Sequence, residues 1–171
     1  DEPDILYEMA NVHVKKGRLP EARAELEKAL AADEGHTRSR YLLAGILAAS
    51  GDREKALAEY GRVLKEDPEN DDAYLHMATL HAERGEFSQA EEVLGALIAR
   101  DPDSHLAHYY RGRVLAAQKK FEEALTDYDK VLSIAPGFDA ALLESGAVLE
   151  ILGRNAEAEE RYTKALHSSP N

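Results

Sequence analysis

The sequence of 171 residues contains no cysteine and no tryptophan. Without cysteine the chain can form neither a disulfide framework nor a thiolate metal site. No apolar run approaches the ~18 residues that a membrane-spanning helix needs, so we expect no insertion into a bilayer. The first residues, Asp1-Glu2-Pro3-Asp4, have neither the basic start nor the apolar stretch of a signal peptide. The sequence shows no targeting signal, so it does not indicate whether the protein is cytoplasmic or periplasmic.

Basic residues are scarce relative to acidic ones. The chain has 21 Lys and Arg against 33 Asp and Glu, which gives a formal charge of −12. A surface of this sign repels phosphate groups, so we expect neither a nucleic acid partner nor anionic lipid. The same charge favours solubility and attracts basic partners.

Glycine and proline are also few, at 11 and 6 residues, and they punctuate the chain regularly. Gly17, Gly51, Gly85 and Gly153 lie on a lattice of 34 residues, with Lys119 at the remaining point. Four further features keep the same phase in all or most of the five units: an alanine, a large apolar residue, a small residue and a proline. They are Ala22, Ala56, Ala90, Ala124 and Ala158; Leu30, Leu64, Ile98, Leu132 and Leu166; Ala10, Ala44, Ala78, Gly112 and Gly146; and Pro68, Pro102, Pro136 and Pro170. This periodicity indicates a repeat protein.

Each unit is predicted to be a helical hairpin. From about Asp4 to Lys16 apolar residues recur at helical spacing, and Gly17 supplies the permissive backbone expected after a helix. The second helix places Ala22, Leu26 and Leu30 on one face. Small residues at the crossing positions allow close approach, and a larger side chain there would overpack at a cost of about 1–3 kcal/mol.

A helix pair with this period resembles the tetratricopeptide repeat family over the whole chain. The resemblance implies an all-α fold, a right-handed superhelical solenoid of five antiparallel helix pairs, with repeats at 3–36, 37–70, 71–104, 105–138 and 139–171. The first repeat lacks the closing proline and the fourth has Lys119 for glycine. The nearest alternative is an RNA-reading family of helical repeats with a 35-residue period. The 34-residue period of this chain and its acidic charge both argue against that family.

The fourth repeat resembles a variant of this family in which an arginine, here Arg111, replaces the usual leucine on the first helix. An unpaired buried charge is costly, so we predict that Arg111 pairs with Asp127 across the hairpin.

The resemblance further implies that the first helices line a concave groove that binds a protein or peptide. The stripe of positions free to face it is predicted to hold Tyr7, Asn11, Arg38, Tyr41, Leu75, His76, Thr79, Tyr109, Tyr110, Arg113 and Leu143. Tyrosine and arginine are enriched at binding hot spots, which favours Tyr41, Tyr109 and Arg113 as anchors. Alternatively, the tyrosines only thicken the packing between hairpins. The mixed charge fits an amphipathic helix or an extended segment.

The chaperone-tail receptors of the same family bind an acidic C-terminus with a clamp of lysine, asparagine and arginine. Of the matching positions here, Tyr7, Asn11, Leu42, Asp72 and His76, only Asn11 has the required side chain. A partner of that kind is therefore not expected.

No catalytic motif or cofactor site is evident, and we expect no enzyme activity. Among the 7 histidines, His13 and His81 are predicted to be satisfied packing residues, and His105 with His108 is too small a set for a structural metal site. We expect an interaction scaffold. The alternatives are an accessory, substrate-positioning region of a larger enzyme, or a structural module that self-associates through its uncapped end repeats. The sequence ends where a repeat closes, which suggests a domain of a longer chain, and its Ala, Leu and Glu content suggests a bacterium.

Overall fold

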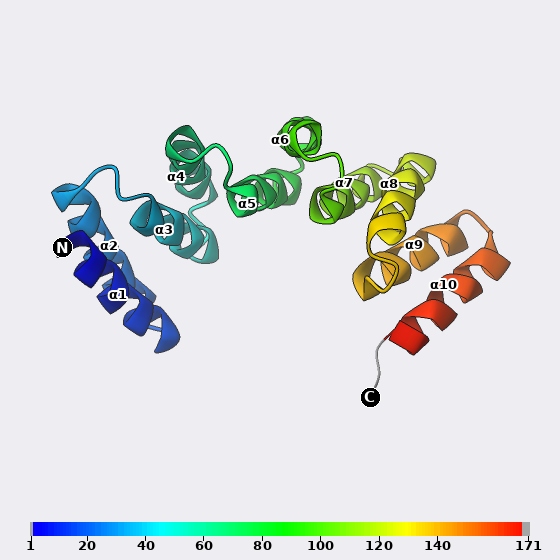
Figure 1. The fold of residues 1–171 in the computed structure, drawn as a ribbon, viewed down its shortest axis with the longest axis horizontal. Helices are drawn as coiled ribbons and strands as arrows, with labels where there is room; N and C mark the ends of the chain where they lie inside the picture. The colour runs from blue at the N-terminus through cyan, green and yellow to red at the C-terminus, as the bar shows by residue number, and fades with distance from the viewer. Residues whose placement is uncertain (1, 169–171) are drawn as a thin grey trace. The chain divides into compact units, whose positions relative to one another are not determined.

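The computed structural model describes residues 2–168, and these residues form ten helices and no strand (Figure 1). The helices form five consecutive pairs, which confirms the all-α fold. Their bounds are α1 Glu2–Lys15, α2 Leu19–Ala32, α3 Thr37–Ala49, α4 Arg53–Glu66, α5 Asp71–Glu83, α6 Phe87–Arg100, α7 His105–Ala117, α8 Phe121–Ile134, α9 Asp139–Ile151 and α10 Asn155–Ser168. The chain divides into two compact units, Asp1–Leu80 and His81–Asn171, and the division falls within α5.

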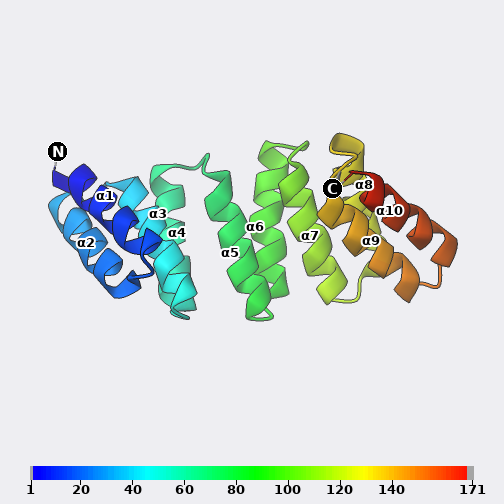
Figure 2. The ribbon, with the colours of Figure 1, turned by 90° about the horizontal axis from the view of Figure 1, so that it is seen from below.

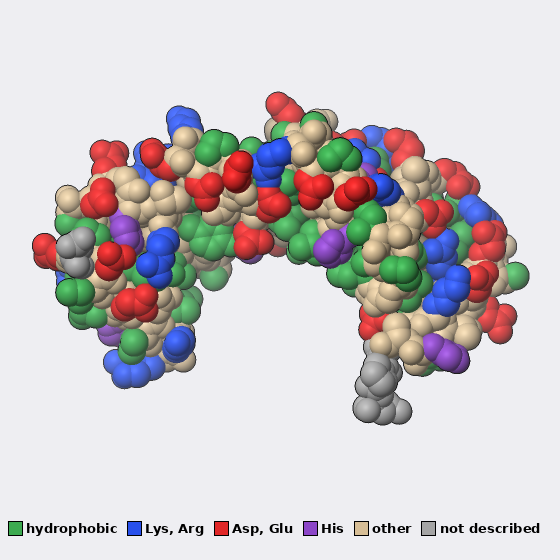
Figure 3. Space-filling model, in the orientation of Figure 1, with side chains coloured by type: hydrophobic (Ala, Val, Ile, Leu, Met, Phe, Trp, Pro, Cys, Tyr) green, Lys and Arg blue, Asp and Glu red, His purple; other side chains and the backbone are tan. Residues whose placement is uncertain are grey.

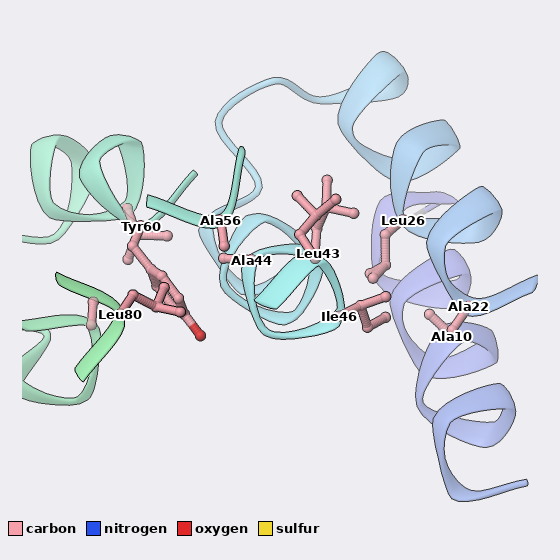
Figure 4. Close-up of a cluster of buried hydrophobic side chains, with 12 residues drawn as sticks. Ala10, Ala22, Leu26, Leu43, Ala44, Ile46, Ala56, Tyr60 and Leu80 are labelled. Carbon is pink, nitrogen blue, oxygen red and sulfur yellow. The ribbon is translucent and has the colours of Figure 1, made fainter. Parts of the chain in front are cut away.

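In the first unit, α1 packs along α2, α2 against α3, and α3 along α4 (Figures 1 and 2). Small residues face one another where paired helices cross, and larger side chains fill the space between hairpins. Figure 4 shows Ala10 beside Ala22, and Leu26 directed toward Ile46 of the next hairpin. These side chains are buried, as the predicted periodicity requires. The core of the unit therefore runs through successive hairpins without a break.

The second unit repeats this arrangement. Here α6 packs on α7, α7 along α8, α8 on α9, and α9 along α10. Tyr128 and Val131 of α8 are fully buried together with Ala141 and Leu149 of α9. Each hairpin thus buries its second helix against the first helix of the next.

The turn inside each hairpin has one common backbone geometry. Gly17, Gly51, Gly85 and Gly153 have φ between 70° and 85°, and Lys119 has φ 62°. At the first turn the Arg18 amide donates to the His13 carbonyl and the Gly17 amide to the Val14 carbonyl, both at 2.9 Å. The corresponding pair of bonds closes all five turns. This is the Schellman arrangement, which needs a left-handed residue after the helix.

The second helices end where the closing prolines predict. Asp67, Asp101 and Ala135 each precede a proline and have non-helical backbones with φ between −126° and −131°, that of Asp101 being extended. A proline disfavours the helical conformation of the residue before it. Asp33 is extended as well, at φ −143°, although Glu34 follows it. The fifth closing proline, Pro170, lies outside the described residues.

Close approach at the helix crossings is most severe where glycine faces tyrosine. A Cβ added to Gly112 would lie 2.7 Å from Cε1 of Tyr128, and one added to Gly146 would lie 2.5 Å from Cε1 of Tyr162. These tyrosine rings therefore occupy the space that an alanine methyl group would need.

None of the helices in residues 2–168 is both long and apolar enough to cross a membrane.

Candidate partner-binding surface

A buried network of charged groups fixes the first helix of the fourth hairpin. Arg111 donates from Nε and Nη2 to the two carboxylate oxygens of Asp127, each at 2.7 Å. The predicted pair is therefore confirmed, and Asp127 is almost fully buried. His108 Nδ1 lies 2.8 Å from the same carboxylate, and its Nε2 lies 3.1 Å from the Pro102 carbonyl. The hydrogen bond to Asp127 is the main cause of a raised Arg111 pKa.

The second hairpin has an equivalent network two repeats earlier. Arg40 donates to Glu59 at 2.8 Å and to the Glu34 carbonyl at 2.5 Å. Arg40, Glu59 and Glu34 precede His108, Asp127 and Pro102 by two repeat lengths. In both hairpins, a side chain of the first helix, Arg40 or His108, joins the second helix to the preceding inter-repeat turn.

The first cluster on the predicted stripe joins α1 to α3. The guanidinium of Arg38 lies over the ring of Tyr7, 4.3 Å from its centroid. Arg38 also lies 3.5 Å from Asp4 and 3.4 Å from Glu8. Both carboxylates are more than half exposed, so the two ion pairs are weak. The cation–π contact and the acids together orient Arg38 across the two first helices.

Tyr41, Tyr60 and His76, here called the first tyrosine pocket, form the second cluster of the same unit. The Tyr60 ring stacks on His76 at 5.3 Å, and Tyr41 contacts Tyr60 edge to face at 5.6 Å. His76 is exposed, Tyr41 is half-buried and Tyr60 is buried. Burial raises the pKa of both tyrosine hydroxyls, with a smaller contribution at Tyr41 from the Asp72 carboxylate. The hydroxyls therefore remain neutral donors at neutral pH.

The second tyrosine pocket comprises Tyr109, Tyr128 and Glu144 of the second unit. The hydroxyls of Tyr109 and Tyr128 each donate to a carboxylate oxygen of Glu144 at 3.4 Å. Burial is the largest cause of the raised pKa of both hydroxyls, and Glu144 adds to it. The pocket therefore presents a carboxylate framed by two aromatic rings.

Further side chains surround the second tyrosine pocket. Arg113 lies over the Tyr109 ring at 5.8 Å and its Nε is 3.4 Å from Glu144. Tyr109 also contacts Tyr110 at 5.5 Å and Phe138 at 5.2 Å, both edge to face. Rigid aromatic rings with a nearby arginine can bind a partner at little entropic cost.

The two pockets occupy equivalent repeat positions. Tyr109, Tyr128 and Glu144 follow Tyr41, Tyr60 and His76 by two repeat lengths. Each pocket takes one tyrosine from each helix of a hairpin and its third residue from the next first helix. The third residue differs in charge, so the pockets differ in the group that they can accept.

The predicted stripe residues fall into three groups. Tyr7, Asn11, Tyr41, Thr79, Tyr109 and Tyr110 are half-buried; Arg38, His76, Arg113 and Leu143 are exposed; and Leu75 is buried. Leu75, at 8% exposure, offers almost no surface to a partner, so we leave it out of the proposed site. The Thr79 hydroxyl donates to the Leu75 carbonyl at 2.9 Å, within its own helix. The tyrosines pack between hairpins and also keep part of each ring accessible.

Sequence reasoning missed three contributors to these pockets. Tyr60 and Tyr128 lie on second helices, outside the predicted stripe, and are buried, but each also contacts the third residue of its pocket. The sequence could have pointed to both tyrosines, because the hydroxyl of a buried tyrosine needs a polar partner nearby. Phe138 lies in the turn before α9 and follows no helical periodicity, so no pattern pointed to it.

His81, His105 and His108 have packing or hydrogen-bonding partners in the structure. His108 is held as described above, and His105 contacts Phe138 edge to face at 5.5 Å. His81 Nδ1 lies 2.7 Å from Glu86, as expected of a satisfied histidine. His13 differs from the prediction, since its buried Nδ1 has no hydrogen-bond partner among the described residues. Within residues 2–168, no group of three or more potential ligands could hold a metal ion.

Comparison with protein families gives three matches, all to tetratricopeptide repeat models. They cover residues 7–71, 47–113 and 105–138. A comparison with curated proteins gives no match.

Several solved structures share the fold. MamA of Desulfovibrio magneticus is 20% identical, with 98% of this chain and 95% of that chain covered and a TM-score of 0.84. A tetratricopeptide repeat protein of Parabacteroides merdae is 20% identical, with coverage of 99% and 66% and a TM-score of 0.85. YrrB, described as having an unusual peptide-binding site, is 21% identical, with coverage of 97% and 86% and a TM-score of 0.71.

Paired helices with a shared turn geometry and tyrosine pockets at equivalent positions define a helical-hairpin repeat protein. The chain belongs to the tetratricopeptide repeat family.

Proposed function

We propose that the chain is a protein-interaction scaffold that binds a peptide or helix of a partner on its first-helix faces. The observation that carries this proposal is the pair of tyrosine pockets at equivalent repeat positions, each with part of a tyrosine ring accessible. Family membership supports it, and one structural neighbour is described as a peptide-binding member of the same family. We propose no catalytic role, in line with that membership.

The contact residues of the proposed site are Tyr7, Asn11, Arg38, Tyr41, His76, Thr79, Tyr109, Tyr110, Arg113 and Leu143. Tyr41, Tyr109 and Arg113 are the proposed anchors, because they combine partial exposure with aromatic or cationic contact. Each pocket has its own preference. Glu144 favours a basic side chain at the second pocket, whereas the His76 ring favours an aromatic or acidic one at the first. Partner segments that carry apolar and charged residues suit either pocket.

The test uses a library of random peptides displayed on phage, selected against the wild-type chain. Peptides recovered in this way are expected to bind a Tyr41→Ala, Tyr109→Ala, Arg113→Ala triple variant at least about tenfold more weakly, as for hot-spot residues. Tyr162→Ala is the matched control, because Tyr162 is a half-buried tyrosine on α10, outside both pockets. The proposal fails if no peptide is selected, or if the triple variant binds like wild type and differs only in its unfolding free energy.

Nucleic acid is not proposed as a partner, because the formal charge of −12 opposes binding to phosphate, and acidic side chains are spread over the face shown in Figure 3. Incubation with a labelled single-stranded RNA oligonucleotide at low salt should leave the mobility of the RNA unchanged in a native gel.

A further inference from the structure

The outer face of α1 is exposed at positions that are buried or half-buried in the other first helices. Ile5, Met9 and Val12 are 62%, 45% and 48% exposed. The residues equivalent to Val12 are Ile46, Leu80, Val114 and Val148, at 4% to 6% exposure. In those hairpins the preceding hairpin covers the face. Among the described residues, α1 packs only on α2 and α3, and no helix covers this face.

The residue sizes on this face do not suit another hairpin of the regular kind. The four residues equivalent to Ile5 are Ser39, Ala73, Ala107 and Ala141, and all are fully buried. Their small side chains let the preceding hairpin approach closely. Isoleucine in that place would overpack a hairpin seated in the same register. The face is therefore apolar but shaped for a different occupant.

Charge is distributed along the same stripe in a way that points to that occupant. Glu2 precedes Met9 by seven residues and Lys16 follows it by seven, so all three lie on one side of the helix. The helical bonding reaches Lys16, whose amide donates to the Val12 carbonyl at 3.3 Å. Ile5 and Val12 lie between Met9 and the two charges. The stripe thus has apolar residues on both sides of Met9, an acid at one end and a base at the other. Asp4 and Glu8 flank the same apolar residues, and both pair with Arg38 of α3.

We propose that α1 pairs with α1 of a second copy of this chain, antiparallel and related by a two-fold axis near Met9. In this arrangement Ile5 of each copy packs near Val12 of the other, and Met9 packs on its own counterpart. Glu2 of each copy meets Lys16 of the other, so the charges are complementary at both ends. A two-fold interface needs one self-complementary surface, and this stripe has that property.

The contact is small, because only three apolar side chains per copy become covered. Interfaces that bury less than about 1,200 Å² in total belong to weak, transient complexes. We therefore expect dimerisation in the micromolar to millimolar range. The surface is separate from the two tyrosine pockets, so it can act whether or not the proposed peptide binding is correct.

The first experiment exchanges the end charges. Glu2→Lys and Lys16→Glu each place like charges opposite one another in a homodimer, so each variant alone should self-associate at least about tenfold more weakly than wild type. An equimolar mixture of the two variants should regain the dimer, because the charges then complement one another. Sedimentation equilibrium over a concentration series measures all three samples. A mixture that associates no better than its components would overturn the antiparallel pairing.

The second experiment locates the two-fold axis. The native chain has no cysteine, so Met9→Cys introduces a single reactive thiol. Mild oxidation should convert Met9→Cys into a disulfide-linked dimer, while the matched control Leu166→Cys, at 78% exposure on α10, should stay monomeric. If Leu166→Lys abolishes association and Met9→Lys does not, the ends stack through α10 and the proposal is wrong. A wild-type chain that remains monomeric at millimolar concentration also refutes it.

Discussion

Lys119 holds the backbone conformation that glycine holds at the other four hairpin turns. A residue with a side chain in the left-handed region costs about 1–2 kcal/mol, which glycine avoids. Part of the stability gained by a glycine substitution is offset by the greater freedom of glycine in the unfolded state. Lys119→Gly should therefore raise the unfolding free energy by about 0.5–1 kcal/mol, measured by urea denaturation. Gly153→Ala is the reverse control, because Gly153 has φ 74° and no atom near the added Cβ. Equal stability in all three proteins would show that the turn backbone is unstrained.

Asp127 is the carboxylate on which Arg111 and His108 converge. Its removal leaves the partly buried Arg111 without its ion-pair partner, so Asp127→Ala should lower the unfolding free energy by about 3–5 kcal/mol. The matched control is Asp129→Ala, two residues away, where the carboxylate is 57% exposed and pairs with Arg161 at 2.5 Å. That exposed pair should contribute about 1 kcal/mol or less. Similar losses for the two variants in chemical denaturation would contradict the buried network.

Hairpin geometry depends on matched residues at the helix crossing. Gly112 faces Tyr128, whereas the corresponding pair in the third hairpin is Ala78 with Leu94. Gly112→Ala should destabilise the chain by about 1–3 kcal/mol, since the buried ring must shift. In a chain that already carries Tyr128→Leu, Gly112→Ala should lower the unfolding free energy by less than it does in the wild-type chain. A double-mutant cycle of unfolding free energies measures this difference. Strict additivity of the two substitutions would mean that the ring moves freely.

At the same scale, the sequence was sufficient to place the hairpins but not every side chain on them. The turn glycines, the closing prolines and the periodic apolar residues agree with one another, so the helices are locally determined. Leu75 shows where this reasoning stops. Position in the repeat placed it on the groove stripe, yet it is only 8% exposed in the structure. Glu144, likewise, meets two tyrosine hydroxyls only once neighbouring hairpins have packed.

At the scale of the whole molecule, buried tyrosines predict a loss of stability in alkali. The pKa of Tyr60 and of Tyr128 is raised above the ordinary value of 10.0, mainly by burial. The folded chain thus retains protons that the unfolded chain releases above about pH 10, so stability is full below that pH and falls above it. Thermal unfolding temperatures should decline less steeply over this range in a Tyr60→Phe, Tyr128→Phe double variant. Parallel declines would show that other groups govern the effect.

The sequence by itself determined the repeat period, the helix ends, the left-handed turns and the Arg111–Asp127 pair, because each depends on residues within one hairpin. Only the tertiary structure decided which side chains meet between hairpins. It brought Tyr41 and Tyr60 to His76, and it left Ile5, Met9 and Val12 uncovered among the described residues. The physical reason is that periodicity gives the face of a helix, while contact and burial depend on what packs against that face.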